Sequence, residues 1–196
     1  MQIVIIEDQP IIAKSIKLEF EAILDNKAKV IVLGSINEVV NFNFEHASHI
    51  VSDLYLGTSI HETIQQLYKI RLVNPNTSIS VFTQSTDIPN IESFLCLIQA
   101  QHLFDKRFCS TIAETVLFGQ PQCFCANKIE LAKALSFINI SGNSQLILED
   151  LARHESVKSI AMESCKSKSA ISQAVKRIEN QIGSKRHYLR MFFKQV

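Results

Sequence analysis

Five short apolar runs constrain the fold of the first 118 residues more than any other feature. They are Ile3–Ile6, Val30–Leu33, His49–Ser52, Ile79–Phe82 and His102–Phe104. The runs are apolar along their length instead of alternating with polar residues, which is typical of parallel strands covered on both faces. Apolar residues in the stretches between runs recur every three or four positions, as in amphipathic helices. The pattern predicts a doubly wound α/β domain with a five-stranded parallel sheet.

The rest of the chain has a different pattern, with helical periodicity and no convincing strand. Residues 119–128 (GQPQCFCANK) break the periodicity and are expected to form a linker. Residues 129–196 are expected to form a small all-α domain, so we predict two domains, with the α/β domain over residues 1–118. The expected helices are Leu131–Phe137, Leu146–Ala152, Val157–Met162 and Ser169–Ile182, followed by the apolar and basic segment Tyr188–Phe193.

Charge divides the chain at the same place. The 196 residues carry 20 Lys and Arg and 19 Asp and Glu. Residues 151–196 hold ten of the basic residues and three Glu, a net charge of +7, and residues 1–150 therefore carry −6. An acidic part joined to a basic part is expected when only the basic part meets a polyanion.

Composition excludes several classes of protein. With 46% hydrophobic residues the chain has enough apolar side chains for a core, and five Gly and four Pro exclude a collagenous chain. No apolar run approaches the roughly 20 residues that span a bilayer, so no membrane association is expected. The N-terminus MQIVIIEDQP lacks the basic lead of a signal peptide. Five Cys without an export signal then indicate reduced thiols in a cytoplasmic protein.

Polar residues follow four of the five predicted strands. Glu7 and Asp8 follow the first strand, Asp53 the third, Thr83 the fourth and Lys106 the fifth. Singly, an Asp or Thr there is commonly a helix N-cap and a Lys a surface charge. In a parallel sheet, however, these positions share one edge, where three carboxylates would repel one another unless a cation joins them. Carboxylate oxygens suit Mg²⁺, and an ammonium and a hydroxyl beside them could bind a phosphoryl group.

The segments IVIIED, HIVSDLYLG, SVFTQS and HLFDK resemble, in this order, the receiver domain of bacterial two-component response regulators, which has a flavodoxin-like fold. The resemblance implies that Asp53 accepts a phosphoryl group from a cognate histidine kinase. It implies that Asp8, Asp53 and the backbone carbonyl of Tyr55 bind Mg²⁺, with Glu7 contributing through water. It also implies that Lys106 pairs with the phosphoryl oxygens.

The same resemblance implies a conformational switch in which Thr83 turns toward the phosphoryl group together with Phe104, although Phe104 fits a plain core aromatic equally well. Three positions depart from the pattern of the family. Gln84 replaces a small residue, Arg107 replaces the proline after the lysine, where a cis peptide would be expected, and Leu56-Gly57-Thr58 replaces Met-Pro-Gly. These departures bear on phosphorylation kinetics and not on the fold.

The basic C-terminal segment has the pattern of a helix–turn–helix. One expected helix carries an apolar stripe at Ile171, Val175, Ile178 and Ile182. A short helix over Val157–Met162 could pack against the stripe, with Cys165-Lys166-Ser167 as the connection. The opposite face is polar: Lys168, Ser169, Ser172, Gln173, Lys176 and Asn180. By itself, such a helix is more often a solvated or protein-binding surface than a DNA-reading one.

From about Leu148 to Arg186, however, the segment resembles the LuxR/FixJ-type helix–turn–helix. The resemblance implies that Ser172, Gln173 and Lys176 contact bases in the major groove of double-stranded DNA. It implies phosphate contacts from five further residues: Lys166, Lys168, Ser169, Arg177 and Lys185.

Two weaker signals have ordinary explanations. Cys123-x-Cys125 provides only half of a zinc site, so linker thiols are expected. Leu189, Phe192 and Phe193 could form a dimer seam or simply close the C-terminal core, and we prefer the second interpretation.

The functional prediction is a cytoplasmic response regulator and transcription factor, not an enzyme, that is phosphorylated at Asp53 and binds DNA as a homodimer. One alternative, motivated by Gln84 and Arg107, is a regulator that binds DNA regardless of phosphorylation. Another is a Mg²⁺-dependent phosphatase with Asp53 as nucleophile. Such enzymes usually need a second Asp two residues later, and Tyr55 occupies that position.

Overall fold

The structure is a computed structural model of the chain. It describes residues 1–25, 27–57, 60–84, 88, 91–107, 111–140, 143–153 and 156–182. Lys185 and the segment Tyr188–Phe193 lie outside the described residues. No helix in the described ranges is long and apolar enough to cross a membrane.

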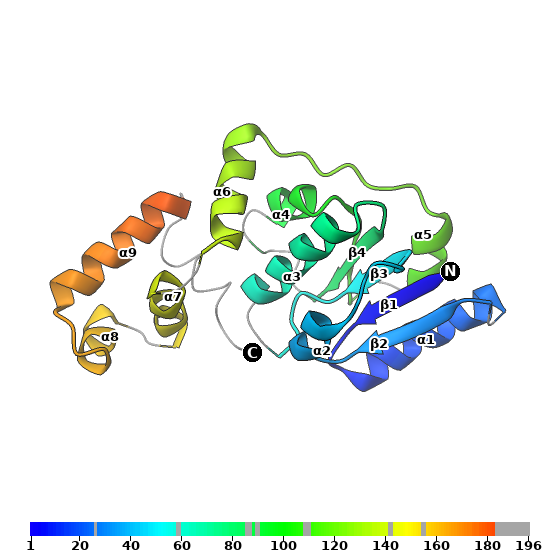
Figure 1. Cartoon of the computed structure of the whole chain (residues 1–196), viewed down its shortest axis with the longest axis horizontal. Helices are drawn as coiled ribbons and strands as arrows, with labels where there is room; N and C mark the ends of the chain where they lie inside the picture. The colour runs from blue at the N-terminus through cyan, green and yellow to red at the C-terminus, as the bar shows by residue number, and fades with distance from the viewer. Residues whose placement is uncertain are drawn as a thin grey trace.

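The strands form one fully parallel sheet in the order β2-β1-β3-β4-β5, which confirms the predicted fold class (Figure 1). The strand bounds are β1 Gln2–Ile6, β2 Lys29–Leu33, β3 His49–Ser52, β4 Ser78–Thr83 and β5 Ala100–Asp105. The last strand is longer than predicted, since pairing with β4 carries its ends beyond the apolar triplet His102–Phe104. The strand order reverses between β1 and β3, and crevices at such points commonly bind ligands.

One face of the sheet is covered by α1 (Pro10–Leu24) and α5 (Ile112–Phe118). Phe20 of α1 is fully buried in the same cluster as Ile3 and Ile5 of β1. Glu19 joins the two helices, because its Oε2 accepts hydrogen bonds from the backbone N–H groups of Ile112 and Ala113 at 3.1 and 3.3 Å. These N–H groups at the start of α5 have no partner within their own helix, so Glu19 satisfies them.

The other face is covered by α2 (Ile36–Asn41), α3 (Ile60–Val73) and α4 (Ile91–Leu97). Arg71 near the end of α3 is buried and fixes α3 to the end of α4. Its guanidinium donates to the carbonyl oxygens of Ile98 at 2.9 Å, Gln99 at 3.2 Å and Pro75 at 2.6 Å.

The segment 119–127 contains no helix or strand and runs from α5 to α6 (Figure 1). It is attached to the sheet edge, because Gln122 N–H donates to the carbonyl of Gln101 in β5 at 2.8 Å. The four helices expected after it are present: α6 Lys128–Ile138, α7 Asn143–Arg153, α8 Val157–Glu163 and α9 Lys168–Ile182. Helix α6 begins three residues before Leu131 because Asn127 and Glu130 form a capping box that starts it earlier.

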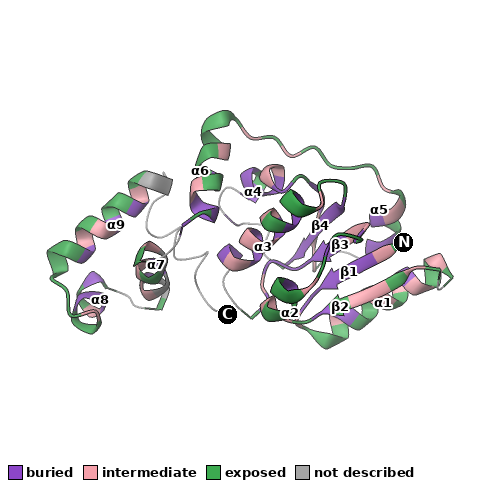
Figure 2. Ribbon diagram, viewed as in Figure 1, coloured by how far each residue is buried: buried purple, intermediate pink, exposed green. Residues whose placement is uncertain are grey.

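The apolar core is continuous from the sheet to the C-terminal helices. Ala134, Phe137 and Ile138 of α6 belong to the same buried cluster as the inner residues of α3 and α4. The buried stripe of α9, including Ile171 and Val175, belongs to that cluster too. Figure 2 shows the C-terminal end of α6 buried and its N-terminal turns mostly exposed.

Candidate functional site

Backbone hydrogen bonds extend beyond the strand ends and fix the positions of the polar residues that follow. Asp53 N–H donates to Ile6 O at 2.8 Å, and Lys106 N–H donates to Thr83 O at 3.0 Å. Glu7 N–H donates to Leu33 O at 3.0 Å. The side chains of Glu7, Asp53 and Lys106 are therefore positioned by the sheet itself, at the carboxyl ends of β1, β3 and β5.

Lys106 lies between two carboxylates. Its Nζ is 2.5 Å from Oε2 of Glu7 and 2.6 Å from Oδ2 of Asp53. All three side chains are at most 4% exposed. The ammonium also lies 5.3 Å from the ring centroid of Phe82 in β4. The site therefore holds a compact, buried set of two negative charges and one positive charge.

Burial raises the pKa of Asp53, and the ion pair with Lys106 opposes that shift. The backbone N–H groups of Leu54 and Tyr55 also favour the charged carboxylate, with Leu54 N–H 2.7 Å from Oδ1. Burial likewise raises the pKa of Glu7, again opposed by Lys106 and reinforced by the negative charge of Asp53. Lys106 therefore favours the charged form of both carboxyl groups, against the larger and opposite effect of burial on their pKa values.

The carboxylates of Glu7, Asp8 and Asp53 can provide oxygens that all lie within 4.8 Å of one another. Asp8 is the more accessible member, since Glu7 and Asp53 are buried. This spacing and this set of hard oxygen donors are able to hold a metal ion. Tyr55, whose carbonyl the resemblance to receiver domains implies as a ligand of the same site, is half-buried after Asp53. Gly57 in that loop has a φ of +66°, and a Cβ there would lie 3.7 Å from Oδ2 of Asp8.

The two predicted switch residues lie on neighbouring strands. Thr83 ends β4 and is fully buried, while Phe104 of β5 is half-buried and pairs in register with Phe82. The Phe104 ring stacks on His102 with centroids 5.6 Å apart. The roles of both residues remain predictions.

Two positions that depart from the receiver pattern lie at the same edge of the sheet. Gln84 is exposed directly after Thr83, and Arg107 forms an ion pair with Asp105 at 2.6 Å. The described residues include no cis peptide bond.

The described members of the predicted DNA-binding set lie on the polar side of α9 and directly before it. The side chains of Lys166, Lys168, Ser169, Gln173, Lys176 and Arg177 are exposed, and Ser172 is half-exposed. Ile171, Val175 and Ile178 of the predicted stripe are buried. They pack with Val157, Ile160 and Ala161 of α8, which are buried in the same cluster.

The cysteines behave as free thiols in the described part of the chain: Cys96, Cys123, Cys125 and Cys165. Glu7, Asp8 and Asp53 are the one group of metal-ligating side chains found within the described ranges, and it includes no Cys or His. The interpretation of Cys123 and Cys125 as linker thiols remains a prediction.

Sequence reasoning missed several residues that support the site or connect the chain's two parts. Phe82 was assigned only to a strand, and nothing in the sequence placed its ring near Lys106. His61 and Gln65 of α3 contact the end of α6, which lies more than 70 residues away. Such contacts depend on tertiary packing, and no local pattern indicates them.

No protein-family model matches the chain, and no curated protein is similar enough in sequence to be counted as a relative. Solved structures do share its fold. RcsB from Salmonella enterica serovar Typhimurium, bound to promoter rprA with the phosphomimetic BeF3−, matches with a TM-score of 0.54 and 18% identity over 96% of this chain and 97% of that chain. The same protein bound to promoter P1flhDC with BeF3− matches with a TM-score of 0.53 and 19% identity, over 97% of this chain and 96% of that chain.

A third structure, described as a complex of the two-component response regulator RcsB with DNA, has a TM-score of 0.50 and 20% identity, and covers 97% of this chain and 98% of that chain. At these identities the likeness establishes the fold. The chain therefore shares, over nearly its whole length, the fold of RcsB.

Proposed function

We propose that this chain is a cytoplasmic two-component response regulator that takes a phosphoryl group at Asp53 and binds double-stranded DNA through α9. The observation that carries the proposal is the buried arrangement of Lys106 with Glu7 and Asp53, joined by Asp8, at the carboxyl edge of the sheet. An arrangement of fixed charges around one nucleophilic carboxylate is what phosphoryl transfer needs. The solved structures compared above are of the response regulator RcsB, in keeping with this role.

In the proposed reaction, an oxygen of Asp53 attacks the phosphorus of a phosphohistidine on a cognate histidine kinase. An acyl phosphate forms, the phosphorus–nitrogen bond breaks, and the histidine leaves with the electron pair. Lys106 would move from Asp53 to the phosphoryl oxygens, and Thr83, coupled to Phe104, would donate its hydroxyl to them. Glu7, Asp8, Asp53 and the carbonyl of Tyr55 would hold Mg²⁺, which neutralises the charge that gathers on the phosphoryl group.

For the C-terminal part, we propose a LuxR/FixJ-type helix–turn–helix formed by α8 and α9 in a domain over residues 129–196, joined by the linker 119–128 to a receiver over residues 1–118. Ser172, Gln173 and Lys176 would contact base edges. Lys166, Lys168, Ser169, Arg177 and Lys185 would contact phosphates, and two copies would occupy paired half-sites. Support comes from the exposure of the described members of this set and from the buried stripe behind them.

Phosphorylation is tested by incubating the chain with acetyl phosphate and Mg²⁺ and measuring the intact mass. One phosphoryl adduct is expected, and it should be absent from Asp53→Ala. Asp105→Ala is the control and should keep the adduct. Asp105 is a carboxylate on the same sheet edge, but it pairs with Arg107 instead of Lys106. An adduct that survives in Asp53→Ala would overturn the assignment of the phosphoacceptor.

A second candidate, DNA binding that does not require phosphorylation, is favoured by one observation. The polar face of α9 is exposed in a structure in which the carboxylate of Asp53 is paired with Lys106. Measuring DNA affinity with and without acetyl phosphate separates the two candidates. Equal affinities in a chain that carries the adduct would favour the second.

A further inference from the structure

Helix α6 is held at its C-terminal end by two side chains of α3. Nε2 of His61 lies 3.0 Å from the carbonyl oxygen of Phe137, and Nε2 of Gln65 donates to the carbonyl of Ile138 at 3.0 Å. A carbonyl only accepts hydrogen bonds, so Nε2 of His61 carries the proton. The last carbonyls of a helix have no partner within it. The first turns of α3 therefore cap the end of α6.

The same end of α6 is anchored by an aromatic contact. The ring of Phe137 is 1% exposed and lies edge-on to His61, with centroids 5.1 Å apart and an interplanar angle of 84°. The ring of Phe94 in α4 also contacts Phe137, with centroids 5.3 Å apart. We call His61, Gln65 and Phe137 the α3–α6 joint.

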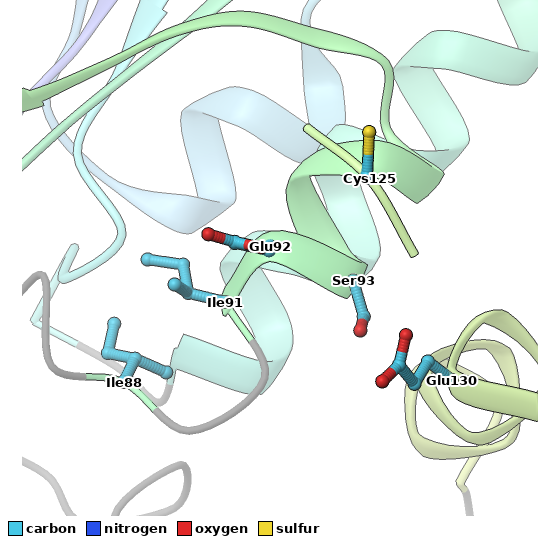
Figure 3. A pocket seen from close by; sticks show the side chains of 6 residues that line it. All are labelled: Ile88, Ile91, Glu92, Ser93, Cys125 and Glu130. Carbon is cyan, nitrogen blue, oxygen red and sulfur yellow. The ribbon is translucent and has the colours of Figure 1, made fainter. Parts of the chain in front are cut away.

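The N-terminal end of α6 is packed less closely. A cavity of about 290 Å³ lies there, lined by Ile88, Ile91, Glu92, Ser93, Cys125 and Glu130. Figure 3 shows Ser93 of α4 and Glu130 of α6 on facing sides of this space. Side chains of α3 thus hold the C-terminal end of α6, and an open pocket lies beside its N-terminal end.

The joint is connected to Asp53 through a short loop. Oδ1 of Asp53 accepts the Leu54 N–H, and α3 begins at Ile60, directly before His61. A phosphoryl group on Asp53 would occupy one carboxylate oxygen and remove the carboxylate charge, so the bonds to Leu54 and Lys106 cannot both persist unchanged. On its far side α6 contacts α9. Leu54 and the inner residues of α3, α6 and α9 belong to one buried cluster, so they form a continuous packed path.

We infer that α6 passes the state of Asp53 to α9, and that His61, Gln65 and Phe137 are the joint through which it does so. The inference rests on the proposed function and adds the element that couples its two sites. Coupling of this kind typically changes affinity by roughly 5- to 150-fold.

The test uses the full chain with beryllium fluoride and Mg²⁺ as the phosphoryl mimic, in wild type, Gln65→Leu and Phe137→Leu. Gln66→Leu is the matched control, since Gln66 is the half-buried neighbour of Gln65 on the same helix. Hydrogen–deuterium exchange of the α6 amides and affinity for a DNA duplex are measured with and without the mimic. In wild type and Gln66→Leu, the mimic should change both quantities.

In Gln65→Leu and Phe137→Leu, the change in DNA affinity on adding the mimic should shrink at least about threefold, towards no change. Slower exchange in the loop after Asp53 should still show that the mimic binds. The inference is overturned if both variants keep the wild-type change, or if wild type binds the mimic without any response in α6. If wild type does not bind the mimic, the proposed role of Asp53 is overturned instead. The wild-type measurement alone reveals this outcome, without any α6 variant.

Discussion

At the scale of single residues, Lys106 is the group on which the site depends, because it is within ion-pair distance of both Glu7 and Asp53 in a buried setting. Two carboxylates this close and this poorly hydrated repel one another, and the ammonium offsets that repulsion. The same ammonium would be the group to meet a phosphoryl oxygen. The Lys106 side chain therefore contributes both to the stability of the fold and to the proposed function.

Lys106→Met should lower the free energy of unfolding at pH 7.5 by about 2–4 kcal/mol, because it leaves two buried carboxylates without their cation. Millimolar Mg²⁺ should restore part of the loss. Urea denaturation with and without Mg²⁺ measures both effects. Lys17→Met, which breaks the surface pair with Glu21, is the control and should change stability by less than about 0.5 kcal/mol. A Lys106→Met protein as stable as wild type would contradict this account.

Gly57→Ala should destabilise the protein by about 1–2 kcal/mol, since φ is +66° and a β-carbon is strained there. Gly34→Ala is the control, because Gly34 has no positive φ and the nearest atom to its added Cβ would be 3.9 Å away. Thermal denaturation of the two variants compares them directly. Equal melting temperatures would show that the loop after Asp53 relaxes without cost.

At the scale of elements, the helices are connected by side chains that satisfy the ends of their neighbours. Glu19 of α1 caps the start of α5, Arg71 of α3 caps the end of α4, and His61 and Gln65 of α3 cap the end of α6. Helix ends leave backbone groups without partners, so such caps fix how one helix sits against the next. Helix α3 takes part in two of these contacts, which makes it the central connector of its face of the sheet.

Arg71→Met should cost about 2–4 kcal/mol of stability, because three carbonyls lose a buried charged donor. The loss should appear as a lower urea midpoint and as faster hydrogen exchange at the end of α4. Lys69→Met, an exposed position on the same helix, should leave both unchanged. Uniformly faster exchange across the whole chain, instead of a local effect, would contradict the role as a cap of α4.

At the scale of the whole molecule, proton uptake should couple stability to pH. Burial lowers the pKa of His49, His61 and His102. In the unfolded chain these histidines bind protons near pH 6.5, whereas in the folded chain they bind protons only at lower pH. The free energy of unfolding therefore falls as the pH drops below about 6.5. Glu7 and Asp53 have the opposite effect on the pH dependence of stability. Their pKa values are raised in the folded chain, so the folded chain binds protons at these residues more readily than the unfolded chain.

His61→Gln isolates one of these contributions, since glutamine does not titrate. Between pH 7 and pH 5.5, the free energy of unfolding of wild type should fall more steeply than that of His61→Gln. The difference in slope should approach about 1.4 kcal/mol per pH unit, the value for one proton. Urea denaturation at a series of pH values provides the measurement, and parallel curves for the two proteins would refute the prediction.

The chain by itself determined the order of strands and helices and the positions of Glu7, Asp8, Asp53, Thr83 and Lys106, because strands buried on both faces are apolar along their length and the residues after parallel strands share one edge. It also determined the buried and polar faces of α9, since helical periodicity is a local property. The start of α6 was misplaced by three residues, although the Asn127 and Glu130 capping pair that sets it is visible in the sequence.

Only the tertiary structure decided which groups meet across long separations. It placed Lys106 between Glu7 and Asp53 with Phe82 nearby, attached Gln122 to the edge of β5, and brought Phe137 against His61 and Phe94. The linker and the charge division predict two domains, and α6 at the start of the second packs against α3, α4 and α9. Packing of this kind depends on the shapes of surfaces that are distant in sequence, and no local pattern encodes it.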